Sequence, residues 1–391
     1  CYRLSYDAYT HMFFADHYRR SWMSLWEPRW YGGFTVTTYP PLVHQFMALM
    51  SIFGDLEIAY QATSTLAALA LSYGVYEVSE AFIPEEARPY AALVASAMPS
   101  VALLLYSYGQ LPLVFSTALA TIDLALFYRY LKTGRRLDLV LAALFAAATV
   151  YSHHLTALCF LSPVAVAILA LSASERGPKI SIARAALLLA VALPIALVPM
   201  IPFFSSLGLL TSQAKIPHGS REDIFSDLTL SIMFFWALYS FTICLLPNAL
   251  AIAYREPRAR YLLVPFLFHL VLGLGGATPV PRLLFGDLWE VLTYERFSFW
   301  ATVLYAPFLA VMLAHGDIFI DRYYEARSEV ERRPRTKLAL SLVFLIPLVL
   351  SFVSASGVLA SIGMQPRQPV SYTHLRAHET EADLVCRLLP E

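Results

Sequence analysis

The sequence has little charge. Asp, Glu, Lys and Arg make up 14% of the 391 residues, whereas a typical soluble domain has about 25%. Acidic and basic residues are equal in number, 28 of each, so no basic excess favours nucleic acid and we expect no such partner. Hydrophobic residues fill 58% of the positions, and the mean hydropathy is +0.59. This balance excludes an ordinary soluble enzyme and indicates an integral membrane protein.

Cysteine is scarce as well. The four cysteines are far apart in the sequence, and two of them lie within apolar runs: Cys1, Cys159, Cys244 and Cys386. This spacing predicts neither a metal site built from cysteines nor a disulfide framework.

The two ends of the sequence differ from the rest. The chain starts at Cys1, and its first 35 residues are polar and aromatic, so we expect a transmembrane helix to precede them in the natural protein. Residues 371–391 change character abruptly and resemble translated sequencing-adapter read-through. We therefore expect this tail, including His374 and His378, to be non-native; a short soluble tail is the alternative.

Long apolar runs fill most of the chain between these ends. A helix of about 20 apolar residues crosses a hydrocarbon core of roughly 30 Å. Ten runs have suitable length and composition: 58–78, 91–107, 112–131, 137–152, 155–172, 184–203, 229–252, 261–276, 298–315 and 338–358. The sequence thus predicts an all-α, polytopic transmembrane bundle with about ten spanning helices over residues 58–360.

The positions of the basic residues predict the topology. Lys and Arg gather in alternate connections between the apolar runs: 129–136, 176–184, 255–260 and 322–337. The connections between these hold few basic residues after residue 57: Lys215, Arg221, Arg282 and Arg296. Short cytoplasmic loops retain positive charge, so the basic connections are expected in the cytoplasm of a multi-pass plasma-membrane protein.

This alternation places residues 1–57 outside, as one large outer loop. Residues 39–53 are apolar, but fifteen helical residues reach only about 22 Å. We therefore expect an interfacial or re-entrant helix there instead of a span. Trp22, Trp26 and Trp30 suit the lipid headgroup region.

The outer loop contains a candidate general base. Asp7 and His11 are spaced i, i+4, so a helix places them on one face, whereas Asp16 falls about 180° away from Asp7. A carboxylate beside a histidine can act as a general base or hold a divalent cation. A solvated helix face at the membrane surface explains the spacing equally well.

Other polar residues stand near the predicted outer boundary. His153 and His154 occupy a tight outer turn and suit either a phosphate or sugar contact or simple helix capping. Arg296 can pair with a phosphate or anchor its helix by snorkelling. Asp123 lies mid-span, where an ionisable group is a functional candidate; a buried carboxyl bonded to Thr121 or a neighbouring helix is the alternative.

Several short motifs, in their order along the chain, resemble the membrane glycosyltransferases of the GT-C superfamily. They are Asp7-Ala-Tyr-Thr-His11, Leu25-Trp-Glu-Pro-Arg-Trp-Tyr-Gly-Gly33, Tyr39-Pro-Pro-Leu42, Gly109-Gln-Leu-Pro112 and Glu295-Arg-Phe297. The chain looks most like the uncharacterised membrane family labelled "6-pyruvoyl-tetrahydropterin synthase-related", although nothing in the sequence supports a pterin chemistry. The resemblance covers residues 1 to about 360.

The resemblance implies transfer of a sugar from a polyprenyl-phosphate donor to an acceptor glycan, lipid or protein at the non-cytoplasmic face. It assigns Asp7 as base or as ligand of a divalent cation such as Mg or Mn, with His11 orienting it. Arg296, His153 and His154 would bind the donor phosphate. Further substrate contacts would come from these residues: Glu27, Tyr39, Gln110 and Glu295.

One departure from the GT-C pattern bears on the metal. Many relatives carry a second acidic residue in the next outer turn, which here reads Tyr106-Ser-Tyr-Gly-Gln-Leu-Pro112. This difference disfavours a metal-dependent mechanism and leaves a metal-independent one with Asp7 as the sole base.

Two rival functions fit the same composition. A multi-pass transporter would show an inverted repeat and broken helices near the midplane, with Asp123 as a coupling residue. A non-catalytic lipid-binding membrane protein would keep the fold without an acid near Arg296. The rivals are separated by whether Asp7 and Arg296 face one cavity.

Overall fold

The computed structural model describes residues 5–30, 32–37, 39–204 and 217–314, with positions 346, 347, 349–351 and 353. Within these residues the chain is almost entirely helical, as expected. Two short strands, β1 (Trp26–Glu27) and β2 (Phe34–Thr35), pair antiparallel as a hairpin. The predicted tail, residues 371–391, lies outside the described residues.

The first half of the chain forms these helices: α1 (Ala8–Arg20), α2 (Leu42–Met50), α3 (Leu56–Val78), α4 (Arg88–Ala97), α5 (Pro99–Leu103), α6 (Leu111–Thr133), α7 (Arg136–Ser152), α8 (His154–Thr156), α9 (Ser162–Arg176) and α10 (Pro178–Leu197). The second half forms these: α11 (Ile201–Phe204), α13 (Leu228–Ser231), α14 (Ala237–Tyr239), α15 (Leu246–Arg255), α16 (Ala259–Gly273), α17 (Val280–Phe285) and α18 (Glu295–Ala314).

Six helical segments in the described ranges are long and apolar enough to cross a membrane: Glu85–Tyr108, Leu111–Thr133, His154–Arg176, Pro178–Phe204, Leu228–Ala251 and Glu295–Ala314. A bent pair, Leu42–Phe53 with Leu56–Ala81, would make a seventh. The chain is thus a multi-pass membrane protein, but the count of about ten is not confirmed. Helices α7 and α16 have only 17 and 15 residues, and the run 338–358 lies largely outside the described residues.

The bundle is organised around α6 and α18. The most apolar windows of these two helices are 83% and 89% buried inside the protein, whereas that of Pro178–Phe204 is 22% buried. α6 packs against α3 and α7, and α18 packs against α4 and α16. Gly74 permits the close approach of α3 to α6, because a Cβ there would lie 2.0 Å from Thr121 Oγ1. The outer helices therefore face lipid while α6 and α18 form the core.

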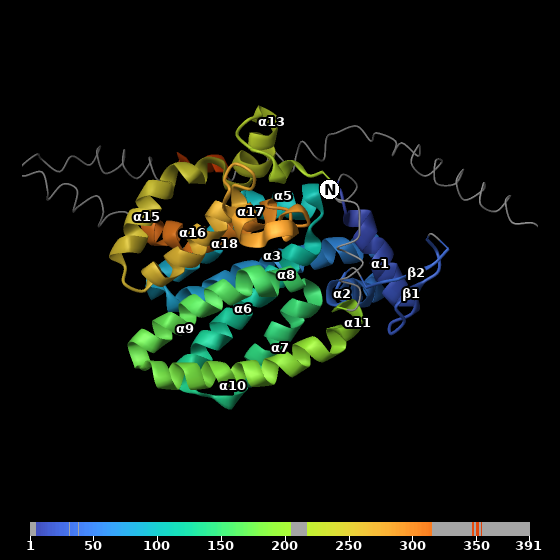
Figure 1. Cartoon of the computed structure of the whole chain (residues 1–391), viewed down its shortest axis with the longest axis horizontal. Coiled ribbons are helices and arrows are strands. Elements are labelled where there is room, and N and C mark those ends of the chain that lie inside the picture. The colour runs from blue at the N-terminus through green and yellow to red at the C-terminus, as the bar shows by residue number, and fades with distance from the viewer. Residues whose placement is uncertain are drawn as a thin grey trace, which may run out of the picture.

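The elements before α3 form a cap at one end of the bundle. Figure 1 shows α1, α2 and the β1–β2 hairpin together at the right-hand end, beyond the ends of the long helices. The chain bends by 119° between Leu42–Phe53 and Leu56–Ala81, and Asp55 caps α3 by accepting a hydrogen bond from Ile58 N at 2.7 Å. Such a bend suits the expected interfacial or re-entrant helix, whose placement in the membrane stays a prediction.

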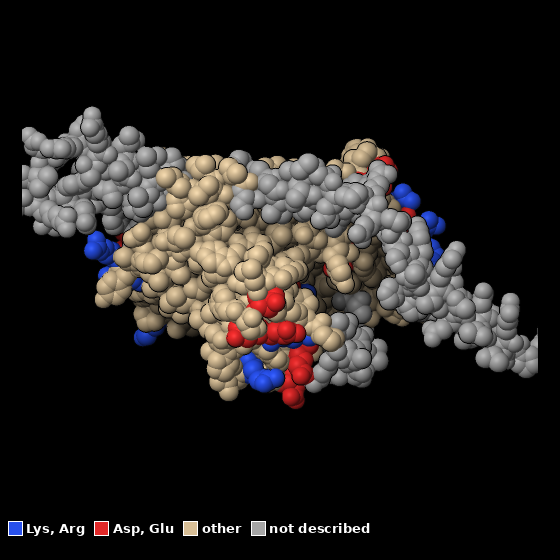
Figure 2. Space-filling model, turned by 90° about the horizontal axis from the view of Figure 1, so that it is seen from above, with Lys and Arg blue, Asp and Glu red and all other residues tan. Residues whose placement is uncertain are grey.

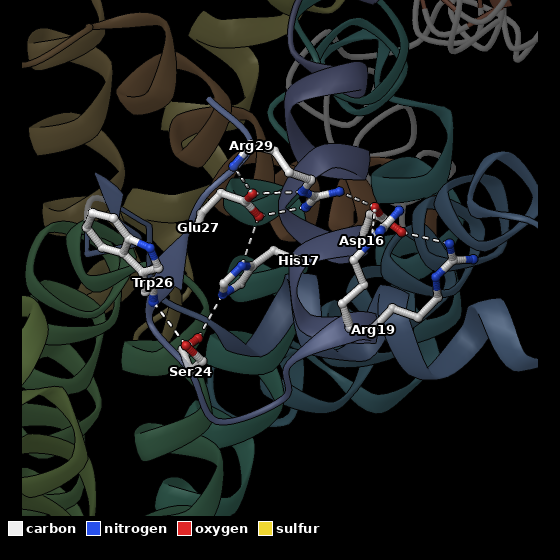
Figure 3. Close-up of polar contacts among 8 residues, drawn as sticks. Asp16, His17, Arg19, Ser24, Trp26, Glu27 and Arg29 are labelled. Carbon is white, nitrogen blue, oxygen red and sulfur yellow. Dashed lines mark hydrogen bonds and ion pairs between the residues drawn. The ribbon is translucent and has the colours of Figure 1, made fainter. Parts of the chain in front are cut away.

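A buried network of charges fixes the hairpin to α1 (Figure 3). Arg29 joins Asp16 of α1 to Glu27 of β1 and donates to both Glu27 oxygens at 2.7 and 2.6 Å. These hydrogen bonds lower the pKa of Glu27 to about 2, although its burial opposes the shift. The ring nitrogens of His17 lie 3.0 Å from Glu27 Oε2 and 2.7 Å from the Ser24 carbonyl oxygen. The network holds α1, and with it Asp7, in a defined place.

The surface agrees with the assignment of the chain as a multi-pass membrane protein. Figure 2 shows a face that is mostly uncharged where it is described, with charged side chains gathered in a few patches and at the two ends. A broad uncharged surface between charged ends is what a bilayer requires of the groups that face it.

The topology can be tested by cysteine labelling. We expect Gly54→Cys, in a background without the native cysteines, to react with an impermeant maleimide added from outside, because charge alternation places 54–57 outside. Arg135→Cys is the matched control, since this exposed residue lies in a basic connection and should react only after permeabilisation. Labelling of the Gly54 variant only from the cytoplasm would reverse the assigned topology.

Candidate active site

Asp7 stands at the start of α1 with its carboxylate unused by the helix. The residue occupies the N-cap position, but its side chain makes no capping hydrogen bond. Its backbone carbonyl accepts from His11 N at 3.0 Å, and the preceding Tyr6 N donates to the carbonyl of Ser107 at 2.9 Å. The half-buried carboxylate is therefore held at the junction between the cap and the turn 106–112.

Gly109 makes this junction possible. Its φ of +75° lies in the left-handed region that favours glycine. A Cβ at this position would lie 2.6 Å from Asp7 N and 2.5 Å from Ser5 Oγ. The turn 106–112, where the GT-C pattern has a second acidic residue, is thus packed directly on the Asp7 backbone.

His11 supports this turn and does not contact the Asp7 carboxylate through its ring. Its Nε2 donates to the Gly109 carbonyl at 2.9 Å, and its Nδ1 lies 3.0 Å from Nε2 of His44. Burial lowers the pKa of His11 to about 4, so the ring is neutral and Nδ1 accepts from His44. The proposed role of His11 in orienting Asp7 would therefore act through Gly109, whose carbonyl the ring contacts.

Arg296 lies at the start of α18, and its charge reaches the other candidates. Burial raises the pKa of Asp7, and the Arg296 guanidinium opposes that rise. The pKa of Tyr39 is raised by burial and by Asp7, again against Arg296. Burial lowers the pKa of His153 well below its usual range, and the positive charge of Arg296 lowers it further. Asp7, Tyr39, His153 and Arg296 therefore share one electrostatic environment.

His153 and His154 enter this environment from the α7–α8 turn. Their rings stack with centroids 6.1 Å apart, and His153 Nδ1 lies 2.8 Å from Thr156 Oγ1. The hydroxyl of Thr156 in turn lies 2.7 Å from Ser116 Oγ of α6. The turn is thus anchored to the bundle core.

Gln110 and Glu295 connect the turn 106–112 to α18. Gln110 Nε2 donates to Glu295 Oε1 at 2.8 Å, and Thr293 Oγ1 donates to the same oxygen at 2.5 Å. Glu295 is buried, and within the described chain neither its Oε2 nor Gln110 Oε1 has a hydrogen-bond partner. Two buried acceptors without a described donor therefore lie where the turn 106–112 meets the start of α18.

The segment 217–227 adds residues that the sequence gave no reason to single out. Ser220 Oγ accepts from Tyr294 N at 3.0 Å, and Arg221 Nε donates to the Leu292 carbonyl at 2.9 Å. Burial lowers the pKa of Arg221; Tyr294 and Glu295 oppose this shift, and the Arg296 cation adds to it. The sequence signal for Arg221 is weak, because it is one of two basic residues, with Lys215, in the connection between the apolar runs 184–203 and 229–252.

Two residues selected from the sequence do not join the cluster. Both oxygens of Glu27 are occupied by Arg29 and His17 in the hairpin network, so we leave Glu27 out of the site. Asp123 lies twelve residues into α6, about 18 Å along the helix from its start. It is buried in the bundle, and no described residue bonds its Oδ1.

A divalent cation does not fit these residues. Among the described residues, no group of three or more His, Cys, Asp or Glu side chains is arranged to hold a metal ion. Mg²⁺ and Mn²⁺ prefer several oxygen ligands, whereas here the Asp7 carboxylate lies under the influence of the Arg296 cation. The turn 106–112 supplies no second carboxylate.

Comparison with known proteins supports the fold. No family model matches the sequence, and no curated protein matches it. The oligosaccharyltransferase of Archaeoglobus fulgidus in its apo form is similar in structure, with a TM-score of 0.55 and 12% identity over 90% of this chain and 52% of that chain. The archaeal oligosaccharyltransferase AglB from the same organism, in complex with an inhibitory peptide and a dolichol-phosphate, gives 0.54 and 13% over 89% and 51%.

The chain spans about half the length of these structures. At such low identity the likeness shows the fold alone, and it does not support the narrower pterin-related label. The described chain therefore shares its multi-helical fold with part of these oligosaccharyltransferases.

Proposed function

We propose that the protein is a membrane glycosyltransferase that moves a sugar from a polyprenyl-phosphate donor to an acceptor at the non-cytoplasmic face of the plasma membrane. The observation that carries the proposal is the shared electrostatic environment of Asp7 and Arg296, two residues 289 positions apart in the sequence, on a GT-C fold. It is supported by a neighbouring structure that holds a dolichol-phosphate.

Asp7 serves as the general base in this mechanism. Its carboxylate takes the proton of an acceptor hydroxyl, whose oxygen attacks the anomeric carbon of the sugar with inversion. A base works best when its pKa approaches the working pH, and burial moves the pKa of Asp7 in that direction. The bond from the anomeric carbon to the phosphate oxygen breaks as the new glycosidic bond forms.

Arg296 stabilises the departing phosphate. A guanidinium can hold two phosphate oxygens at once, and it meets the charge that develops on the leaving group. His153 stays neutral beside this cation because its pKa is lowered, so it can donate a hydrogen bond to a phosphate or sugar without adding charge. His154 serves in the same way, and Tyr39, Gln110 and Glu295 contact the substrate.

The polar candidates favour an enzyme over a transporter. Transport sites lie near the bilayer midplane, between broken helices. Here the cluster gathers at helix starts and turns at one end of the bundle, where α1 and α18 begin. Asp123 stands apart from it. A lipid-binding protein of the same fold is distinguished by the assays below.

Replacing the proposed base should abolish transfer. We expect Asp7→Asn to lower the rate by about 10²–10⁴-fold, the usual contribution of general-base catalysis, because an amide keeps the shape but takes no proton. The measurement is sugar transfer from polyprenyl-phosphate donors by the purified protein. Asp16→Asn on the same segment should lower the rate less. Its carboxylate pairs with Arg19, Arg20 and Arg29, so it affects Asp7 only through the position of α1.

The reverse order, with full activity in Asp7→Asn and loss in Asp16→Asn, would assign the base to Asp16. Activity of both variants with every donor would favour the lipid-binding alternative.

Arg296 should control donor affinity. Arg296→Ala removes a charge-assisted pair with the phosphate worth about 1.5–3 kcal/mol, so donor binding should weaken about 10- to 150-fold, measured by titration. Arg296→Lys should recover only part of this, because an ammonium lacks the fork geometry. Arg282→Ala, an exposed arginine of α17, is the control. Equal losses in both alanine variants would contradict the assignment.

Gly109 should matter through its contact with Asp7. In Gly109→Ala a methyl group would lie 2.6 Å from Asp7 N, so the start of α1 must shift and the transfer rate should fall at least 10-fold. Gly177→Ala is the control: its φ of +95° is also left-handed, but a Cβ there would have no atom within 4 Å. If both variants lose activity equally, backbone strain is responsible and the contact is not.

A further inference from the structure

A groove runs along α9 and α16 at the end of the bundle remote from the candidate site. It encloses about 690 Å³ between the two helices, within the range of ligand pockets. Its walls are apolar over most of their length: Pro163, Val166, Ala167, Ala170, Val264 and Pro265. Val166 and Val264 are 64% and 70% exposed, so within the described chain this apolar surface faces outward.

The length of the groove matches one leaflet of a bilayer. Along α9 it extends from Pro163 to Glu175, a separation of twelve positions or about 18 Å of helix. One leaflet contributes about half of a hydrocarbon core of roughly 30 Å. His154 stands at the other end of the same helical segment, His154–Arg176, so the groove lies along the part of this segment away from the candidate active site.

Basic residues surround the end of the groove at Glu175, away from Pro163. Arg258 Nη2 pairs with Glu175 Oε1 at 2.8 Å and so joins α16 to α9. Arg260 is exposed, donates through Nε to the Tyr254 carbonyl at 2.5 Å, and lies over the Tyr254 ring at 5.2 Å from its centroid. Arg176 and Arg255 are close to these residues in the sequence, and the acidic residues of the same segments are Glu175 and Glu256. Figure 2 shows basic side chains at this end, on the left.

We propose that this groove binds one anionic phospholipid, with an acyl chain along the apolar walls and the phosphate on Arg260 and Arg258. The segments 175–176 and 255–260, at this end of the groove, contain four arginines and two glutamates. Their net positive charge favours an anionic headgroup. Basic pockets between transmembrane helices bind anionic headgroups in this way. An arginine also holds a phosphate by two parallel hydrogen bonds. The site is independent of the proposed transfer reaction.

Native mass spectrometry of the purified full chain tests the headgroup. We expect one bound phosphatidylglycerol, retained at least 10-fold more strongly than phosphatidylcholine of the same chains. Arg260→Gln should remove this preference, and Ala170→Trp, which fills the groove, should abolish binding of both lipids. Arg136→Gln, an exposed arginine of another basic connection, should change nothing. Glycerol phosphate should not compete, since it lacks the acyl chain.

Equal retention of the two lipids, or an equal loss in Arg136→Gln, would overturn the proposal. Arg260→Gln keeps it testable if Ala170→Trp fails to fold, because Arg260 is exposed.

A photoreactive residue at Val264 identifies the occupant. In membranes that contain phosphatidylglycerol we expect the crosslinked adduct to be phospholipid. An adduct to residues 338–358 of the same chain would show that the protein covers its own groove. An adduct to a second copy would show an interface between protomers. Either protein adduct, formed without a lipid adduct, would overturn the lipid assignment.

Discussion

The contact between Gly109 and the start of α1 is the constraint on which the candidate site depends. The cap of α1, α2 and the hairpin also packs on α3, α6 and α7. His11 and Gly109 join it to the turn before α6, with a hydrogen bond of 2.9 Å and a backbone approach that excludes any Cβ. A buried polar group that loses its partner costs about 1–3 kcal/mol, so the neutral His11 ring strongly favours this docked arrangement. The position of Asp7 follows from it.

The same turn extends the connection to α18. Gln110 follows Gly109 directly and donates to Glu295, the residue before Arg296. The proposed general base and the proposed phosphate ligand therefore lie on either side of one short turn, although they are far apart in the sequence. The hydrogen bond also fixes the Gln110 amide, because the reversed orientation would set its oxygen against the Glu295 carboxylate. Small shifts in this turn would move both partners of the proposed reaction at once.

The sequence predicted what depends on composition and on charge order. The helical class and six of the spans follow from apolar run length. The outer side of residues 1–57 stays a prediction from basic clusters such as 129–136. Asp7 and Arg296 could be selected because a resemblance supplied their roles. His44, the hairpin network and the closeness of Gly109 to Asp7 depend on contacts between distant segments, which no local pattern encodes. The partners of Glu27, Arg29 and His17, likewise become visible only once the hairpin folds.

The opposing effects on Asp7 suggest an order for the proposed reaction. Burial raises the pKa of the carboxyl, while the Arg296 cation lowers it. A donor phosphate paired with Arg296 would neutralise that cation and remove the lowering effect. The pKa of Asp7 would then rise, and its carboxylate would become a stronger base only when the donor is in place. Without a bound donor there is no sugar to transfer. This coupling would therefore link proton removal from the acceptor to the presence of an activated sugar.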